Sequence, residues 1–405
     1  MTNGIQRNLL AARMRVIKPS PSMAAKKKVE TLRAAGKTII DFTIGEPDLP
    51  TPAHIVDAAV TAIRKGGTKY TASAGMRELL EAVAHKFQRE NGLAYETDQL
   101  IVGTGAKQLI YTALAATLDE GDEVIIPTPF WVSYPDMVVL NGGKPVILET
   151  SSESGFLVLA KDLERAITPK TKWLLLNSPN NPSGAIYSAA QFQEIAAVLE
   201  RHPHVFLMLD EIYEHFSYDA PYVSLATYSE QLRERTLLVN GVSKAYAMTG
   251  WRIGYAAGPA PLIKAISTLI SQTTSCASEP SQHAAVAALT LDQTCVSEAC
   301  KLFAERRNII VPLLNEIDGI TCASPQGAFY VFPSVKGLLG KRTPDGKIIE
   351  SDLDFVHYLL DSTGVAVLDG SAYGTPGFIR ISFATDLNTI REGCEKIAFA
   401  CSQLQ

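Results

Sequence analysis

The stretch VFLMLDEIY, from Val205 to Tyr213, decides the fold class, because a continuous apolar run ends abruptly in acidic and polar residues. A β-favouring run without alternation is typical of a strand that helices cover on both faces. A second stretch repeats the pattern, since the apolar run Thr236 to Val239 leads to Ser243 and Lys244. These two runs predict neighbouring strands of a mostly parallel α/β sheet.

Five further apolar runs of similar length predict the rest of a seven-stranded sheet. They are Leu100 to Val102, Glu123 to Ile126, Pro145 to Leu148, Trp173 to Leu176 and Gly254 to Ala257. Helical periodicity separates several of these runs, as at Ala189 to Glu200. The last two strands are separated only by Asn240 to Ile253, whereas a parallel crossover usually needs a helix. We therefore expect this pair to be antiparallel or joined by a functional loop.

The C-terminal part of the chain has a different pattern, in which long helical stretches come before short strands. Helices are predicted at Pro280 to Leu291 and Ser297 to Ile317, and strands at Ala328 to Phe332, Val365 to Leu368 and Phe378 to Phe383. We expect a large domain at residues 49–310 and a smaller α+β domain at residues 311–405. Residues 1–48 form an N-terminal segment and part of the small domain in this interpretation.

Composition narrows the classes of function. The chain has 405 residues, of which 46% are hydrophobic, and 37 Lys and Arg stand against 42 Asp and Glu. This is a globular composition, and a net charge of -5 with interspersed signs disfavours nucleic acid as a partner. The six cysteines show neither CxxC pairs nor metal-ligand spacing. With no secretory signal and no membrane span in sight, we expect a cytoplasmic protein without a metal site.

Polar residues follow the predicted strands, at the sheet edge where α/β proteins bind ligands. Gly105, Ala106 and Lys107 follow the first run and open a helix, so they form either a phosphate site or a plain tight turn. Asn181 lies in a loop of turn-forming residues and either aims its amide at the site or only shapes the turn. Asp210 ends a buried strand, where a carboxylate needs a cationic partner or access to solvent.

Lys244 and Arg252 lie in the loop between the last two strands. A lone lysine in a loop is usually a solvated surface residue, but a buried lysine near other cations becomes a nucleophilic amine. Together with the residues above, these side chains place an acid, an amine and phosphate donors at one sheet edge. This set fits a phosphorylated aldehyde cofactor that forms a Schiff base with a lysine.

The residues also resemble a known family, the class I, fold-type I pyridoxal-phosphate aminotransferases, and most of all its bacterial aspartate aminotransferases. The resemblance runs through nearly the whole chain. Its anchors are Ile44 to Asp48, Lys69 to Thr71, Gly105 to Lys107, Phe130 to Tyr134, Asn180 to Gly184, Asp210 to Tyr213, Ser243 to Tyr255, Gly327 to Tyr330 and Phe378 to Ser382.

The resemblance implies pyridoxal 5'-phosphate as the cofactor and assigns residues to it. Lys244 would form the Schiff base and move the substrate proton, while Asp210 would pair with the pyridine nitrogen. Tyr213 and Asn181 would contact the 3-oxygen, and Trp131 would stack on the ring. The residues implied at the phosphate are Gly105, Ala106, Ser243 and Arg252, with Lys107 beside them and Tyr70 reaching over from a neighbouring subunit. The resemblance thus implies a homodimer with shared active sites.

The substrate residues implied by the resemblance are Arg380 and Gly45 for the α-carboxylate, with Trp131 and Asn181 nearby. A guanidinium offers two parallel hydrogen bonds to a carboxylate. Lys107 matches a lysine that some bacterial members place at the distal carboxylate of a dicarboxylic substrate. We therefore expect ping-pong transamination between L-aspartate and 2-oxoglutarate.

Other readings stay open from the sequence. An aromatic, alanine or prephenate aminotransferase would share Lys244, Asp210 and Arg380 and differ only around the distal group. A lyase or synthase of the same fold would also use Lys244, although Asn181 and Trp131 favour transamination. The ligand-sensing half of a transcription regulator fits poorly, because no basic helix-turn-helix precedes Gly45.

Overall fold

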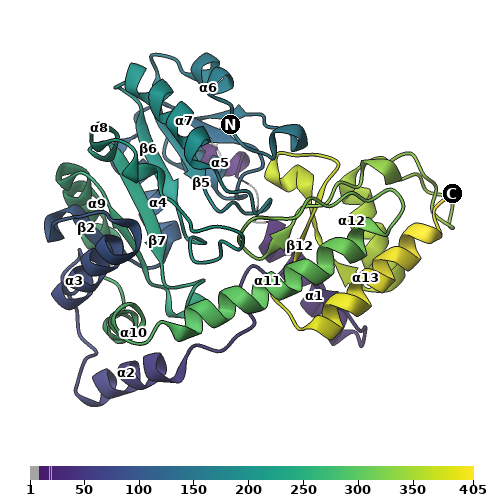
Figure 1. The fold of residues 1–405 in the computed structure, drawn as a ribbon, viewed down its shortest axis with the longest axis horizontal. Helices are drawn as coiled ribbons and strands as arrows, with labels where there is room; N and C mark the ends of the chain where they lie inside the picture. Colours follow the sequence, from purple (N-terminus) through teal and green to yellow (C-terminus); the bar gives the residue numbers. More distant parts are fainter. Residues whose placement is uncertain (1–8, 18, 20) are drawn as a thin grey trace, which may run out of the picture.

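The computed structural model describes residues 9–17, 19 and 21–405, and the predicted N-terminal segment therefore lies partly outside the described residues. Its centre is a seven-stranded sheet in the order β2-β8-β7-β6-β5-β3-β4 (Figure 1). The strands are β2 (Leu100–Gly103), β3 (Glu123–Pro127), β4 (Lys144–Leu148), β5 (Thr171–Asn177), β6 (Phe206–Asp210), β7 (Thr236–Gly241) and β8 (Gly254–Ala257). The prediction of a seven-stranded, mostly parallel sheet is confirmed.

Strand β8 is the one antiparallel member of this sheet. It pairs antiparallel with β7, where Val239 lies opposite Ala256, and with β2 on its other side. The segment between β7 and β8 has no room for a crossover helix, so the chain turns back on itself, which is one of the two alternatives that the sequence leaves open. The remaining pairs, β3 with β4 and β5, β5 with β6, and β6 with β7, are parallel.

Helices cover both faces of the sheet because its strands are apolar on both sides. In β5, Trp173 and Leu175 pack into one core, whereas Leu174 and Leu176 pack into the core on the opposite face. The helices of this part are α2 (Ala53–Arg64), α3 (Arg77–Lys86), α4 (Ala106–Thr117), α5 (Tyr134–Leu140), α6 (Ala160–Ala166), α7 (Ala189–Arg201), α8 (Glu230–Arg233), α9 (Ala260–Thr273) and α10 (Glu279–Thr290).

A separate core lies in the C-terminal part. Its elements include α11 (Thr294–Asn315), β9 (Tyr330–Val331), α12 (Asp352–Thr363), β10 (Val365–Ala366), β11 (Leu368–Asp369), β12 (Ile379–Ser382) and α13 (Leu387–Ser402). Figure 1 shows α11 running from beside the large sheet towards α12 and α13. Because α11 continues through residues 310 and 311, the predicted border there lies inside a helix, and the domain borders stay predictions.

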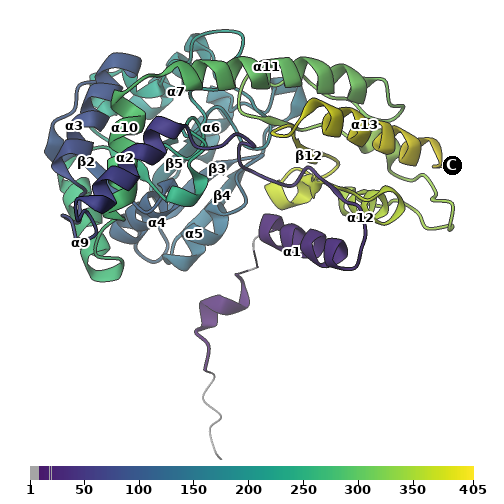
Figure 2. The same cartoon turned by 90° about the horizontal axis from the view of Figure 1, so that it is seen from below.

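The N-terminal segment joins this second part. Strand β1 (Ile40–Asp41) pairs in parallel with β10, and α1 (Pro21–Ala34) lies against the C-terminal elements (Figure 2). The single strand predicted at Val365 to Leu368 is wrong in detail. The chain divides there, because β10 pairs with β1 while β11 pairs antiparallel with β12.

Candidate active site

A cavity of about 380 Å³ opens at the carboxyl ends of the sheet strands, between the sheet and the C-terminal part. Its lining includes most of the site residues that the sequence predicts. These are Gly45, Ala106, Lys107, Trp131, Asn181, Asp210, Tyr213, Ser243, Lys244, Arg252 and Arg380. Gly105 lies directly beside Arg252 at the edge of the cavity. Tyr70 lies elsewhere, and it is 88% exposed.

Lys244 comes from the loop between β7 and β8. This loop holds two non-glycine residues in the left-handed region, Ala247 at φ 50° and Arg252 at φ 57°, which is uncommon for residues with a side chain. The Lys244 Nζ donates a hydrogen bond to the carbonyl oxygen of Gly45 at 2.5 Å. Burial lowers the pKa of Lys244 to about 8; the negative charge of Glu46 opposes this shift, and Arg380 and Arg252 add to it. The amine is therefore partly neutral near neutral pH.

Asp210 ends β6 as a buried carboxylate. The hydroxyl of Tyr134 donates to its Oδ2 at 2.6 Å, and the backbone N–H of Ile212 donates to its Oδ1 at 3.2 Å. Burial raises the pKa of Asp210, although both hydrogen bonds and the charge of Lys244 oppose this. Among the described residues, no lysine or arginine lies within 4 Å of the carboxylate. Asp210 is thus a buried acid available to a cationic group in the cavity.

A chain of polar contacts connects Tyr213, Asn181 and Arg380. The Tyr213 hydroxyl lies 2.9 Å from the Tyr330 hydroxyl and 3.5 Å from the Asn181 Nδ2, which donates to it. Asn181 also accepts from the Arg380 Nη1 at 3.2 Å, and its own N–H donates to the Asn177 Oδ1 at 2.8 Å. One asparagine therefore touches both the tyrosine and the arginine of the predicted site.

Arg380 is a buried guanidinium on β12. Its side chain is only 2% exposed, and its Nη2 donates to the carbonyl oxygen of Thr43 at 2.6 Å. The Nε has no hydrogen-bond partner. The guanidinium carbon lies 4.6 Å from the Tyr330 ring centroid, and within the described residues no carboxylate approaches it to 4 Å. Such a charge calls for an anion in the cavity, because buried charges are normally paired.

The first turn of α4 lines the cavity and begins at a glycine. Gly105 is its N-cap at φ 82°, and no side chain caps the helix. A methyl group on Gly105 would collide with the Arg252 guanidinium, and one on Gly254 would collide with the backbone of Ala106. Ser243 is buried beside them in the cavity lining. Small residues, a helix N-terminus and an arginine thus leave room for a phosphate group.

Lys107, the residue after Ala106 in α4, and Trp131 line the same cavity. The Lys107 Nζ is 4.6 Å from the Trp131 ring centroid and donates to the Ser133 Oγ at 3.3 Å. Burial lowers the pKa of Lys107, and the nearby charge of Arg252 adds to the effect. This places a second cation, without a carboxylate partner in the described part of the chain, in the cavity that contains Arg380.

Several cavity residues were missed by the sequence reasoning. Tyr134 and Tyr330 lie inside motifs that carried the family resemblance, so a signal for both was present. Thr43 contributes only its backbone carbonyl, and such a contact leaves no trace in the sequence. Met23 and Lys26 reach the cavity from α1, a helix with no recognisable motif.

Comparisons with known proteins agree with this geometry. Residues 37–397 match the family model for "Aminotransferase class I and II". The chain is 52% identical to an aspartate aminotransferase of Rhizobium meliloti, over 97% of this chain and 96% of that protein. It is 49% identical to an aspartate/prephenate aminotransferase of Cereibacter sphaeroides, over 96% of this chain and 97% of the other.

Solved structures show the same relationship. A crystal structure of the Rhizobium meliloti aspartate aminotransferase superposes with a TM-score of 0.96 at 51% identity, covering 98% of this chain and all of the other. The Thermus thermophilus aspartate aminotransferase with maleate gives a TM-score of 0.91 at 39% identity, covering 97% and 100%. The chain therefore belongs to the class I and II aminotransferases and is a pyridoxal-phosphate-dependent enzyme.

Proposed function

We propose that this enzyme transfers the amino group between L-aspartate, or a closely related amino acid, and 2-oxoglutarate by a ping-pong mechanism. The observation that carries the proposal is that the buried Arg380, which pairs with no carboxylate of the described residues, lies in one cavity with a second cation, Lys107. A dicarboxylic amino acid brings two anionic groups to such a cavity. The names of the curated relatives and the maleate in the Thermus thermophilus structure support this choice.

The cavity residues fit pyridoxal 5'-phosphate. The concave site at Gly105, Ala106, Ser243 and Arg252 would hold the phosphate, and the buried acid Asp210 would face the pyridine nitrogen. The remaining contacts would come from Tyr213 and Asn181 at the 3-oxygen, Trp131 at the ring face, Lys107 near the phosphate and Lys244 at the aldehyde carbon. When bound, the cofactor supplies an electron sink for the electrons left on the substrate Cα.

The protein's own contribution is to orient the substrate and to move one proton. Two parallel hydrogen bonds from Arg380 would fix the α-carboxylate, with Gly45 and Asn181 beside it, so that the Cα–H bond points to Lys244. The Lys244 Nζ, with its pKa lowered to about 8, can hold that proton and pass it on at neutral pH. Burial of Arg380 keeps water from competing for the guanidinium.

A second candidate is dual use of aspartate and prephenate. It is favoured by the name of the Cereibacter sphaeroides relative and by the contact of Lys107 with the Trp131 ring, which places a cation and an aromatic face side by side. Aromatic and alanine aminotransferase activities have no such support. Steady-state kcat/KM values would rank them, measured for the amino donors aspartate, phenylalanine and alanine with 2-oxoglutarate, and for the amino acceptor prephenate with aspartate as donor. We expect aspartate to have the highest or second-highest kcat/KM, and a higher value for alanine than for aspartate would refute the proposal.

We also propose a homodimer with shared active sites in the cytoplasm. Tyr70 is exposed and lies outside the cavity of its own chain, as expected for a residue that reaches the phosphate of a partner subunit. All six cysteines are free thiols, which suits a reducing compartment. Among the described residues, no helix is long and apolar enough to cross a membrane.

Mixed subunits would test the shared sites. A hybrid of Lys244→Ala and Tyr70→Ala subunits would contain one site with both native residues. Activity regained on mixing would support the proposal, whereas the plain average of the two parents would refute it.

A further inference from the structure

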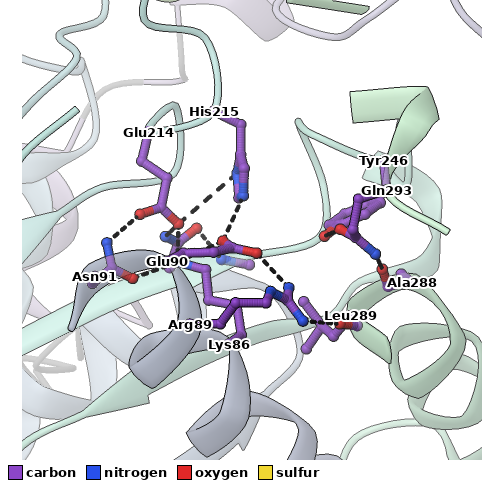
Figure 3. Close-up of polar contacts among 12 residues, drawn as sticks. Lys86, Arg89, Glu90, Asn91, Glu214, His215, Tyr246, Ala288, Leu289 and Gln293 are labelled. Carbon is purple, nitrogen blue, oxygen red and sulfur yellow. Dashed lines mark hydrogen bonds and ion pairs between the residues drawn. The ribbon is translucent and has the colours of Figure 1, made fainter. Parts of the chain in front are cut away.

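A second polar cluster lies behind the active site, outside the cavity lining, and Figure 3 shows it. At its centre is Lys86, the last residue of α3, which is 0% exposed. Its partner is Glu214, which comes from the loop after β6 and is also buried. None of the active-site chemistry described above uses this pair.

Both oxygens of the Glu214 carboxylate accept hydrogen bonds. Its Oε1 accepts from the Lys86 Nζ and from the Asn240 Nδ2, the latter at 2.6 Å. Its Oε2 accepts from the Asn91 Nδ2 at 2.8 Å, and Lys86 donates to the Asn91 Oδ1 at 2.9 Å. A buried carboxylate with a cation and two amides around it has one defined position.

Glu214 lies close in the sequence to two active-site residues. Glu214 directly follows Tyr213 and lies in the short loop that begins after Asp210, the last residue of β6, whereas Asn240 lies near the end of β7, shortly before Lys244. The hydrogen bond from Asn240 to Glu214 therefore connects the loop that follows Asp210 to the end of β7, which leads directly into the loop that carries Lys244.

The backbone hydrogen bonds between β6 and β7 reach only the start of this loop. The hydrogen bonds between β6 and β7 end where the N–H of Glu211 donates to the Val239 carbonyl at 2.9 Å. Two residues after Val239, the N–H of Gly241 donates to the Asn240 side-chain Oδ1 at 2.7 Å. Beyond the last of these backbone hydrogen bonds, the side chains of Asn240 and Glu214 connect the two segments.

A metal site is the other use that this cluster suggests, because Glu90, Glu214 and His215 offer ligand atoms within 4.8 Å of one another. The acids are already neutralised, however, since Lys86 pairs with Glu214 and Arg89 pairs with Glu90. The His215 Nε2 also lies 2.9 Å from the Glu90 Oε2. A metal ion would have to displace a fully buried ammonium, which makes the ion-pair arrangement the functional one.

We propose that Glu214 is a positioning residue for transamination: anchored by Lys86 and bonded to Asn240, it fixes the Asp210–Tyr213 loop relative to Lys244. The inference rests on the proposed function. A small displacement of reacting groups is enough to lower the rate of an enzyme strongly, even when the mutated residue does not touch the substrate.

The test uses the cofactor-loaded variants Glu214→Gln and Asn240→Ala, with Arg89→Met as the matched control. Arg89 belongs to the same cluster but bonds only to Glu90 and to the Leu289 carbonyl oxygen, so it touches neither site loop. The measurements are the pH titration of the visible absorbance of the bound cofactor, kcat and KM for aspartate, and the thermal unfolding midpoint.

We expect both variants to move the pH midpoint of the cofactor absorbance and to lower kcat about tenfold to a hundredfold, with KM near the native value. Arg89→Met should change neither. If Glu214→Gln does not accumulate as folded protein, Asn240→Ala decides, because it keeps the ion pair intact.

Variants that lose thermal stability yet keep the native pH midpoint and kcat would overturn the proposal and leave the cluster a structural role only. A native enzyme that turns over no amino acid would refute the proposed function instead. The absorbance titration would then still report whether Glu214 positions Lys244, because it depends only on the bound cofactor.

Discussion

Replacing Arg380 by methionine tests whether its guanidinium serves to bind the substrate carboxylate or to stabilise the fold. The native side chain has two hydrogen bonds, to Thr43 and Asn181, and no carboxylate partner in the described residues. Hydrogen bonds of charged groups contribute about 1.5–3 kcal/mol each, so the substitution loses about 3–6 kcal/mol. It also removes the desolvation cost of a buried ion, which is several kcal/mol. The two contributions are of similar size and opposite sign, so the net change in the stability of the cofactor-free protein should be small, on the order of 1 kcal/mol.

Arg306 provides a matched comparison, because it is 5% exposed and binds Asp48 with two hydrogen bonds of 2.7 and 2.8 Å. Breaking a buried ion pair costs about 3–5 kcal/mol. The Asp48 side chain is 31% exposed, and solvent screening reduces the loss expected for Arg306→Met to about 2–3 kcal/mol. Denaturant unfolding of both cofactor-free variants measures the difference.

For catalysis we expect the opposite order, with a larger loss of kcat/KM for Arg380→Met than for Arg306→Met. Two charge-assisted bonds to the substrate carboxylate correspond to a loss of about 10²- to 10⁴-fold in kcat/KM for Arg380→Met. If Arg380→Met unfolded at least as easily as Arg306→Met, the charge of Arg380 would already be compensated in the free protein. The proposal that Arg380 binds the substrate α-carboxylate would then be wrong.

Three further substitutions test the other proposed roles. Lys107→Ala should lower kcat/KM for aspartate about tenfold to a hundredfold while changing that for phenylalanine little, and equal losses would point to a phosphate or structural role instead. Asp210→Asn should still bind the cofactor, as measured by equilibrium titration, but lose about 10²- to 10³-fold in kcat, and full activity would remove its role. Burial lowers the pKa of Lys244 from its usual 10.5 to about 8. Below pH 8 the buried cationic amine therefore destabilises the cofactor-free fold, and this destabilisation disappears as the pH rises from about 8 to 10.5. Lys244→Met should therefore stabilise the cofactor-free protein at pH 7 by roughly 2 kcal/mol, a value reduced because the Lys244 side chain is partly exposed to the cavity. Denaturant unfolding measures this gain in stability, and a gain that increased towards pH 10 would contradict the prediction.

The sheet and its ligand-binding edge could be predicted because their signals are local. Apolar runs mark β5, β6 and β7, and the short segment after Val239 predicts the reversed direction of β8. The division of Val365 to Leu368 into two strands had no local signal, since it depends on pairing with β1, more than 300 residues earlier in the chain.

The side-chain partners within the site were harder to predict. Tyr134 donates to Asp210 across 76 positions, and Arg380 reaches the carbonyl of Thr43 across 337. Neither contact follows from periodicity or spacing. Without the family resemblance, Arg380 is simply an arginine on a late strand, and only its burial in the fold shows that it lacks an anion.

A single-turnover reaction of the cofactor-loaded enzyme with L-aspartate alone tests the central claim most directly. Without any 2-oxoglutarate, one equivalent of oxaloacetate per active site should form, with conversion of the visible absorbance to that of the aminated cofactor. Lys244→Ala should form none in the same time. Three results would contradict the proposed transamination: a wild-type enzyme that leaves aspartate unchanged, release of ammonia in place of cofactor amination, or a Lys244→Ala variant that reacts at the native rate.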